Sequence, residues 1–213
     1  MDQMLVYADS LSWGIIPDTR LRLTFTERWP GVFEQGLNAR GHPTRVIENC
    51  LNGRRSVWED PFKAGRNGSE GLAQVMEMHA PLRLVLLMLA TNDFQRSHDN
   101  NAWLSAQGVA RLVQIMRQAP IEPGMPVPDI LLIAPPLIGQ PKGAIAGKFA
   151  GADRRCQGLV EALREVAREQ ATGFFDANRV IRASPVDGIH LDAAAHRVLG
   201  EAIATEVAAM LNG

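Results

Sequence analysis

Three side chains at opposite ends of the chain have the types that acyl transfer needs. A serine hydroxyl attacks an acyl carbon at neutral pH only when a nearby base accepts its proton and a third group holds that base in the right tautomer. Ser10 is a candidate nucleophile, His190 is a candidate base, and Asp187 stands three residues before the histidine. An Asp-x-x-His pair is weak evidence by itself. Acyl transfer by these three residues is therefore a hypothesis, and it needs support from other positions in the sequence.

The remaining histidines and the cysteines have simpler interpretations. The other four histidines lie in a turn, near element ends or within a predicted helix, and we interpret them as structural: His42, His79, His98 and His196. Cys50 and Cys156 are interpreted as packed thiols in a reducing compartment, with Cys50 as an alternative nucleophile. Because the histidines are scattered and neither Cys-x-x-Cys nor a phosphate-binding glycine loop occurs, we expect no metal and no cofactor.

Apolar segments of strand length alternate with longer amphipathic segments, which is typical of an α/β fold. The candidate strands cover residues 4–8, 44–47, 82–89, 129–134 and 172–175. The third and fourth are almost continuously apolar, as expected for parallel strands that are covered on both faces. Helical periodicity follows Asn101, Asp153 and Leu191, and Asp192 is the expected N-cap of the last helix.

Two segments, 54–68 and 135–151, have little periodicity and are long for connections in an α/β fold, which usually have about two to six residues. Loops of this kind often form lids, ligand walls or subunit contacts. The chain has no internal repeat, linker or low-complexity tract. We therefore predict a single domain over residues 1–213 that carries these two long loops.

The charge balance narrows the range of partners. The chain has 22 basic and 23 acidic side chains and a formal net charge of −1, without the clustered Lys and Arg that binding to nucleic acid or a membrane surface requires. No apolar run approaches the roughly 18–20 residues that span a bilayer, and the acidic start lacks the basic region of a signal peptide. We expect a cytoplasmic protein that acts on a small, neutral molecule.

Polar residues follow the candidate strands. In an open parallel sheet, ligands bind beyond the carboxyl ends of the strands. The residues found there carry hydroxyl, amide, carboxylate and imidazole groups: Asp9 and Ser10 after the first strand, Asn52 after the second, Asn92 and Asp93 after the third, and Asp187 and His190 after the fifth. The α/β interpretation thus predicts that the candidate groups meet at one edge of the sheet.

Four of these segments together resemble the SGNH hydrolases, also called GDSL esterases. The chain lacks the Gly-x-Ser-x-Gly sequence of the α/β-hydrolases. It has instead, in the order and approximate spacing of the SGNH family and over nearly its whole length, Asp9-Ser10-Leu11, Asn52-Gly53, Thr91-Asn92-Asp93 and Asp187-Gly188-Ile189-His190. The extension Ser12-Trp13-Gly14 is most similar to the bacterial arylesterase and acyltransferase branch. This resemblance implies a three-layer α/β/α sandwich with a flavodoxin-like five-stranded parallel sheet.

The resemblance also implies roles for individual residues. Ser10 would be the nucleophile, His190 the general base and then the general acid, and Asp187 the group that orients His190. The oxyanion hole would consist of the backbone N–H groups of Ser10 and Gly53 and the side-chain amide of Asn92. The expected reaction is hydrolysis of short-chain aryl or acetyl esters through an acyl-enzyme, with water or an alcohol as the acceptor.

Relatives in this branch use inserted loops to build homo-oligomers. The resemblance therefore implies a homo-oligomer here too, with Trp58 and Phe62 of segment 54–68 at the contact.

Several assignments stay open at this stage. Asp9 either contacts the substrate or holds the serine loop, and Trp13 is either a wall of the acyl pocket or part of the core. Alternative functions are a carbohydrate O-acetyl esterase, a thioesterase or lysophospholipase, and a weakly active ligand-binding module.

The last alternative is motivated by Ala8 and Ala90, which stand where the family has glycine. Because both positions end strands, we expect negative φ at each, and alanine would then only narrow the floor of the site.

Overall fold

Five parallel strands form the centre of the molecule. The computed structural model describes residues 1–212, and in it the strand order is β2-β1-β3-β4-β5. The strands are β1 (Asp2–Ala8), β2 (Thr44–Cys50), β3 (Leu84–Met88), β4 (Asp129–Ala134) and β5 (Gly173–Asp176). Every neighbouring pair is parallel, and this order is the flavodoxin-like one. The predicted fold class is confirmed, and β4 has the predicted bounds.

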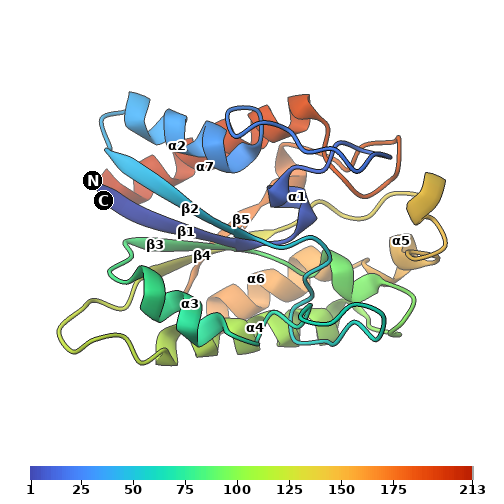
Figure 1. Cartoon of the computed structure of the whole chain (residues 1–213), viewed down its shortest axis with the longest axis horizontal. Coiled ribbons are helices and arrows are strands. Elements are labelled where there is room, and N and C mark those ends of the chain that lie inside the picture. The colour runs from blue at the N-terminus through green and yellow to red at the C-terminus, as the bar shows by residue number, and fades with distance from the viewer. Residues whose placement is uncertain (213) are drawn as a thin grey trace.

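Helices cover both faces of the sheet, which gives three layers (Figure 1). On one face lie α2 (Trp29–Ala39) and α7 (Ala193–Asn212). On the other lie α3 (Leu72–His79), α4 (Ala102–Gln118) and α6 (Leu159–Glu169). None of the helices in residues 1–212 is long and apolar enough to cross a membrane.

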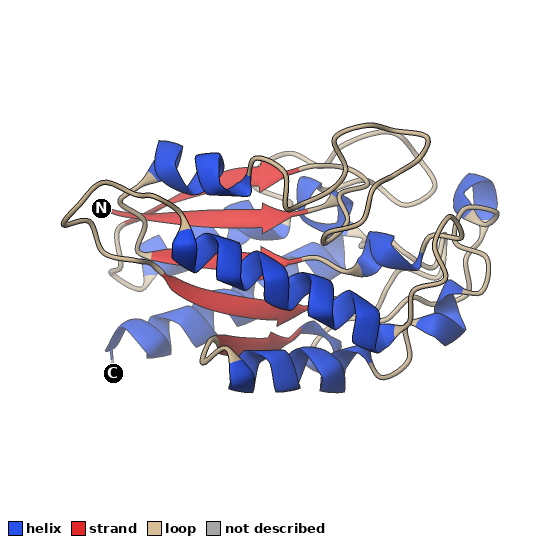
Figure 2. Ribbon diagram, turned by 90° about the horizontal axis from the view of Figure 1, so that it is seen from below, coloured by secondary structure: helices blue, strands red, loops and turns tan. Residues whose placement is uncertain are grey.

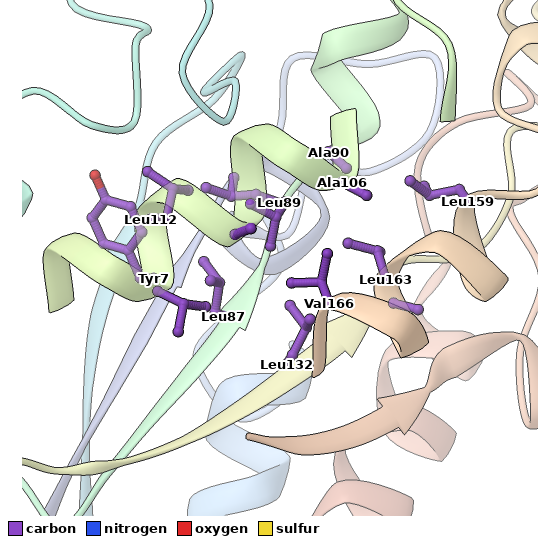
Figure 3. Close-up of a cluster of buried hydrophobic side chains, with 14 of the residues drawn as sticks. Tyr7, Leu87, Leu89, Ala90, Ala106, Leu112, Leu132, Leu159, Leu163 and Val166 are labelled. Atoms are coloured by element: carbon purple, nitrogen blue, oxygen red, sulfur yellow. The ribbon is translucent and has the colours of Figure 1, made fainter. Parts of the chain in front are cut away.

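The alternation of side chains along β3 explains its continuous apolar run. Leu86 packs in the core shared with α2 and α7, whereas Val85 and Leu87 pack in the core shared with α4 and α6. Figure 3 shows the second core, which contains both Leu87 of β3 and Leu163 of α6. Because successive side chains of a strand point to opposite faces, a strand covered on both sides needs apolar residues at every position.

The predicted helices after Asn101 and Leu191 are present with their caps. Asn101 Oδ1 accepts a hydrogen bond from the backbone N–H of Leu104 at 2.9 Å, and Asp192 Oδ1 accepts one from Ala195 at 2.8 Å. The helix expected after Asp153 is also present and begins at Leu159. The Asn101 and Asp192 side chains thus pair with backbone N–H groups that would otherwise lack a partner at the start of a helix.

Sequence periodicity did not reveal α2, because proline and two glycines interrupt its apolar pattern. Pro30 lies at the helix start, where its missing N–H costs nothing. A Cβ atom at Gly36 would lie only 2.7 Å from the Cβ of Ala204 in α7. The glycine is therefore required for the close approach of two helices, which a single segment of sequence does not display.

Short helical turns begin at the carboxyl ends of the strands. They include α1 (Ser10–Trp13), η1 (Thr91–Phe94) and η3 (Ala177–Arg179), while η2 (Gly143–Ile145) and α5 (Ala152–Arg155) lie in and after segment 135–151. Figure 2 shows the larger loops gathered at the end of the sheet to which the strand arrows point. The larger loops of the described chain therefore lie next to the residues that follow the strands.

Candidate active site

Ser10, His190 and Asp187 form a continuous chain of contacts at the carboxyl end of the sheet. Ser10 is the first residue of α1, directly after β1 and Asp9. Its Oγ lies 3.2 Å from Nε2 of His190, and Nδ1 of His190 lies 2.7 Å from Oδ2 of Asp187. Residues 180 positions apart in sequence thus have the geometry of a nucleophile, a base and the group that orients the base.

A tight turn sets the carboxylate of Asp187 before the imidazole. Oδ1 of Asp187 accepts hydrogen bonds from the backbone N–H groups of Ile189 and His190, both at 2.9 Å, which leaves Oδ2 for the histidine ring. Burial alone would raise the pKa of Asp187, but the hydrogen bonds from His190 and Ile189 lower it overall. The residue therefore stays a carboxylate, the form that can hold the Nδ1–H tautomer.

Gly188 allows segment 135–151 to close over this turn. Its φ is +77°, and a Cβ atom there would lie 2.1 Å from the carbonyl oxygen of Gln140. Backbone hydrogen bonds from Gly139 to Gly188 at 2.8 Å and from Lys142 to Asp187 at 3.0 Å join the two segments. The long loop thus supports the turn that carries Asp187 and His190.

Asn92 lies at the start of η1, beside Ser10, and its amide is held at both ends. Its Nδ2 donates to Oδ2 of Asp9 at 2.8 Å, and its Oδ1 accepts from Nε2 of Gln95 at 2.6 Å. An amide nitrogen has two N–H groups, so one remains for a ligand. Asn92, Ser10 and Gly53 line the same cavity, whose volume is about 200 Å³. The residues expected for an oxyanion hole are therefore together.

Asp9, considered a candidate for substrate contact, lies beneath the site. It is 1% exposed and does not line the cavity among the residues described. One carboxylate oxygen accepts from Asn92 and the other from the backbone N–H of Leu11 at 2.9 Å. Burial raises the pKa of Asp9 to about 6. Its contacts are those of a residue that holds the serine and asparagine loops.

Trp13 is likewise absent from the described lining of the cavity. Its ring instead packs against the guanidinium group of Arg22, whose Cζ lies 4.5 Å from the ring centroid. The apolar wall beside Ser10 is formed by Ile15, Ile145 and Phe149. Two of these three belong to segment 135–151, whose lack of periodicity hid their role.

Two residues that sequence reasoning did not single out, Gln95 and Arg55, support the amide of Asn92. Oε1 of Gln95 accepts a hydrogen bond from Nη2 of Arg55 at 2.7 Å. The Arg55 side chain is fully buried and also lies 3.6 Å from the carboxylate of Asp60. A chain of polar contacts thus runs from segment 54–68 through Gln95 to Asn92. Its only sequence signal was an arginine directly after the Asn52-Gly53-Arg54 motif.

Asp93 is fully buried and ties the same loop to α4. Its carboxylate accepts from the hydroxyls of Ser56 and Ser105, both at 2.6 Å, and from the backbone N–H of Ser56 at 2.8 Å. Burial raises the pKa of Asp93, while the hydrogen bonds from the two serines counteract it. The residue lies away from the cavity and fixes η1 in place.

Ala90 corrects one sequence expectation. Its φ is +107°, in the region that favours glycine, whereas Ala8 lies in extended β1 and is not among the residues with positive φ. The prediction of negative φ was therefore wrong at Ala90, because the chain leaves β3 through a sharp turn into η1. An alanine in this conformation is strained.

Other candidate groups lie outside this arrangement. Burial and the charge of Glu48 raise the pKa of the Cys50 thiol, so it is a poor nucleophile. His196 accepts a hydrogen bond from the backbone N–H of Trp29 at 3.2 Å, and burial lowers its pKa to about 4. Within residues 1–212, no group of three or more His, Cys, Asp or Glu side chains is arranged to hold a metal ion.

Solved structures of esterases are similar to this chain over nearly their whole length. The inhibitor-bound aryl esterase of M. smegmatis has 30% identity and a TM-score of 0.92, with 98% of this chain and 99% of that chain covered. A carbohydrate acetylesterase from Sinorhizobium meliloti has 32% identity and a TM-score of 0.92, with 99% and 100% covered.

A carbohydrate acetylesterase family member from the same organism has 34% identity and a TM-score of 0.92, with both chains fully covered. No curated protein matches the chain. Residues 9–198 match the GDSL-like lipase/acylhydrolase family, and this range includes Ser10, Asn92 and His190. The chain therefore belongs to the GDSL-like lipase/acylhydrolase family and is a carboxylic ester hydrolase.

Proposed function

We propose that this hydrolase cleaves short-chain aryl or acetyl esters through an acyl-enzyme on Ser10. The observation that carries the proposal is the contact chain from Ser10 through His190 to Asp187, with distances of 3.2 and 2.7 Å. Ser10 and His190 line the same cavity as Gly53 and Asn92. The nucleophile and the groups that would stabilise the tetrahedral oxyanion therefore lie in one small cavity.

In the first step, Oγ of Ser10 forms a bond to the ester carbonyl carbon while its proton moves to Nε2 of His190. The carbonyl π electrons move to the oxygen and give a tetrahedral oxyanion. The carbon–oxygen bond to the alcohol then breaks, and the departing alcohol takes the proton from His190. Asp187 stabilises the imidazolium that exists between these two transfers.

Negative charge on the tetrahedral oxygen needs fixed donors. The backbone N–H groups of Ser10 and Gly53 and the second N–H of Asn92 serve this purpose in the proposal. Such donors stabilise the transition state without reorganising, and loss of one costs about 10²–10³-fold in kcat. The two-sided support of Asn92 by Asp9 and Gln95 favours this role.

In the second step, water or an alcohol attacks the acyl carbon and gives its proton to His190, and the bond to Ser10 breaks with return of that proton to Oγ. Water gives hydrolysis and an alcohol gives acyl transfer. The cavity of about 200 Å³ between Ile15, Ile145 and Phe149 favours a short acyl group. The alternatives of aryl ester and carbohydrate acetyl ester both stay open, because the similar solved structures include both kinds of enzyme.

The experiment is a steady-state assay with p-nitrophenyl acetate on the wild type and two variants. Ser10→Ala removes the nucleophile and should abolish turnover above background. Asn92→Ala should lower kcat by about 10²-fold with little change in KM, because the donor acts mainly in the transition state. Undiminished turnover by Ser10→Ala, or an unchanged kcat in Asn92→Ala, would show the proposal to be wrong.

We also propose that the chain forms a homo-oligomer through segment 54–68. Phe62 is 90% exposed at this loop, and burial of such a side chain in a subunit contact would be favourable. The expected result of light scattering is an oligomer in the wild type that Phe62→Ser weakens. A wild-type monomer at all concentrations would contradict the proposal.

A further inference from the structure

Three cationic side chains line the cavity that contains Ser10. Arg20, Lys63 and Lys148 line this cavity together with the candidate catalytic groups. They come from three segments that lie far apart in sequence: the loop after α1, segment 54–68 and segment 135–151. Their meeting at one place is therefore a property of the fold.

No carboxylate lines this cavity among the residues that the structure describes. Its other lining residues are neutral or histidine: Ser10, Ile15, Asn52, Gly53, Asn92, Gln95, Ile145, Phe149 and His190. The whole chain has nearly equal numbers of acidic and basic residues, so a lining with three cations and no acid departs from the composition of the chain. The local charge differs from the charge that the whole sequence suggested.

Of the nearby carboxylates, Asp60 is shared between two cations, and Asp18 lines an adjoining cavity and not this one. Asp60 lies 3.8 Å from Nζ of Lys148, but the same Oδ2 lies 3.6 Å from the buried guanidinium of Arg55. Asp18 lines an adjoining cavity with Arg20, and its carboxylate lies against Gly143. Neither Arg20 nor Lys63 forms an ion pair with any residue in 1–212.

The electrostatic environment of Lys148 agrees with this description. Burial lowers the pKa of its ammonium group, the charge of Asp60 raises it, and the positive charges of Arg55, Lys63 and Arg20 lower it further. These cations are thus close enough to repel one another. A ligand with a negative charge would relieve that repulsion.

We propose that the preferred ester carries an anionic group, such as a carboxylate, that binds between Arg20, Lys63 and Lys148. This inference rests on the proposed function, because it assigns the charge of the molecule that Ser10 attacks. It replaces the neutral ester expected from the overall charge balance.

The anionic group belongs on the alcohol side of the ester. Lys63 and Lys148 also line a larger neighbouring cavity of about 550 Å³. Phe62, Arg96 and Asp60 line it too, and the carboxylate of Asp60 is already shared between Arg55 and Lys148. The cavity beside Ser10 is smaller, about 200 Å³, and suits a short acyl group. An alcohol or phenol that extends past Lys63 would meet the apolar ring of Phe62 and place its charge among the cations.

The test compares three acetyl esters that differ in charge: 4-acetoxybenzoate, its neutral methyl ester and the cationic 4-acetoxyphenyltrimethylammonium. Release of the phenol gives kcat/KM for each with the wild type and with the triple variant Arg20→Gln, Lys63→Gln, Lys148→Gln. Intrinsic reactivity differs among the esters, so the measured quantity is the ratio of wild type to variant for each ester. Differences in leaving-group pKa cancel in this ratio.

The three exposed charges act on the ligand over several ångströms and are screened by salt. The ratio of wild type to variant should therefore be about ten for the anionic ester. The ratio should be near one for the neutral ester and below one for the cationic ester. Raising the salt concentration should reduce the preference of the wild type for the anionic ester. The control variant Arg45→Gln, Arg111→Gln, Arg117→Gln removes three exposed arginines that do not line the cavity, and its ratios should stay near one for all esters.

The possible failures are distinguishable. If the wild type cleaves all three esters but the triple variant changes their kcat/KM values equally, the inference about charge is overturned and the esterase proposal stands. If the wild type cleaves none of them, the esterase proposal itself is contradicted. If the triple variant is unstable, the single variant Lys63→Gln, at an exposed residue that forms no ion pair within residues 1–212, should still give a ratio of wild type to variant of about two for the anionic ester and near one for the neutral ester.

Discussion

The amide of Asn92 illustrates what one residue can contribute and what it needs from others. An oxyanion donor is effective when its N–H points at the developing charge before the reaction starts. Asp9 holds one side of the amide at 2.8 Å and Gln95 the other at 2.6 Å, and Arg55 in turn holds Gln95. The orientation of the donor therefore depends on two residues that do not touch the reacting atoms.

Gln95 is consequently expected to act as a positioning residue. Gln95→Leu should lower kcat for p-nitrophenyl acetate by about tenfold with KM nearly unchanged, because a misdirected amide loses transition-state stabilisation. Gln95→Glu keeps an acceptor for Arg55 but loses the donor to Asn92. It should therefore lower kcat similarly while retaining the stability that Gln95→Leu sacrifices at the buried arginine.

A double-mutant cycle separates this role from a general structural one. In the Asn92→Ala background there is no amide left to orient, so Gln95→Leu should have little further effect on kcat. Equal reductions of kcat in both backgrounds would mean that Gln95 does not act through Asn92.

Residue types together with the resemblance to the SGNH family predicted the meeting of Ser10, Asp187 and His190, because each chemical role admits few side chains. They did not predict Gln95 and Arg55, which are 40 positions apart and joined by a hydrogen bond that exists only in the folded chain. The same limit applies to Trp13. Its position near the serine suggested a pocket wall, but Arg22 occupies the face of its ring.

At the scale of elements, the buried strands were predictable, whereas helix α2 was not. The continuous apolar run of β3 follows from cores on both faces of the sheet. The sequence of α2 contains Pro30, Gly31 and Gly36, which weaken a helical pattern. The structure shows that Gly36 is needed against Ala204 of α7. Tertiary contact thus requires a residue that local propensity disfavours.

The strand ends of β1 and β3 offer a matched test of backbone strain. Ala8 is the last residue of β1, and Ala90 lies two residues after the end of β3. Both are fully buried, but only Ala90 has positive φ, at +107°. Replacement by glycine loses one buried methyl group at each site, about 0.8 kcal/mol, and adds flexibility to the unfolded chain. Only Ala90→Gly also relieves strain of about 1–3 kcal/mol.

Urea unfolding measures the difference. Ala90→Gly should be less destabilising than Ala8→Gly by about 1–3 kcal/mol, which is the strain present at one site and absent at the other. Equal losses of unfolding free energy in the two variants would show that the turn after β3 stores no strain.

At the scale of the whole molecule, the parallel sheet makes the site possible. The flavodoxin-like order places β1 between β2 and β3, so the residues that follow these strands meet at one edge. The family motifs in the sequence predicted this arrangement well because each motif follows a strand. The cations that line the cavity were not predictable. Arg20, Lys63 and Lys148 come from irregular loops whose paths no periodicity defines.

Total charge was a poor guide to the charge of the site for the same reason. A formal net charge of −1 describes a sum over the surface, whereas a substrate responds to the few charges within about a Debye length, 8–10 Å. The lining of the cavity beside Ser10 contains three cations and, among the described residues, no carboxylate. Local charge therefore has to be read from the folded molecule.

The central claim is that the acyl group passes through Ser10, and trapping that intermediate tests it most directly. The protein is mixed with p-nitrophenyl acetate, quenched in acid within one turnover, digested and mapped by mass spectrometry. We predict an acetyl group on the peptide that contains Ser10 in the wild type, and none on that peptide in Ser10→Ala or His190→Ala. An unmodified Ser10 peptide during active turnover, or acetylation that persists in the Ser10→Ala protein at another residue with full activity, would contradict the account.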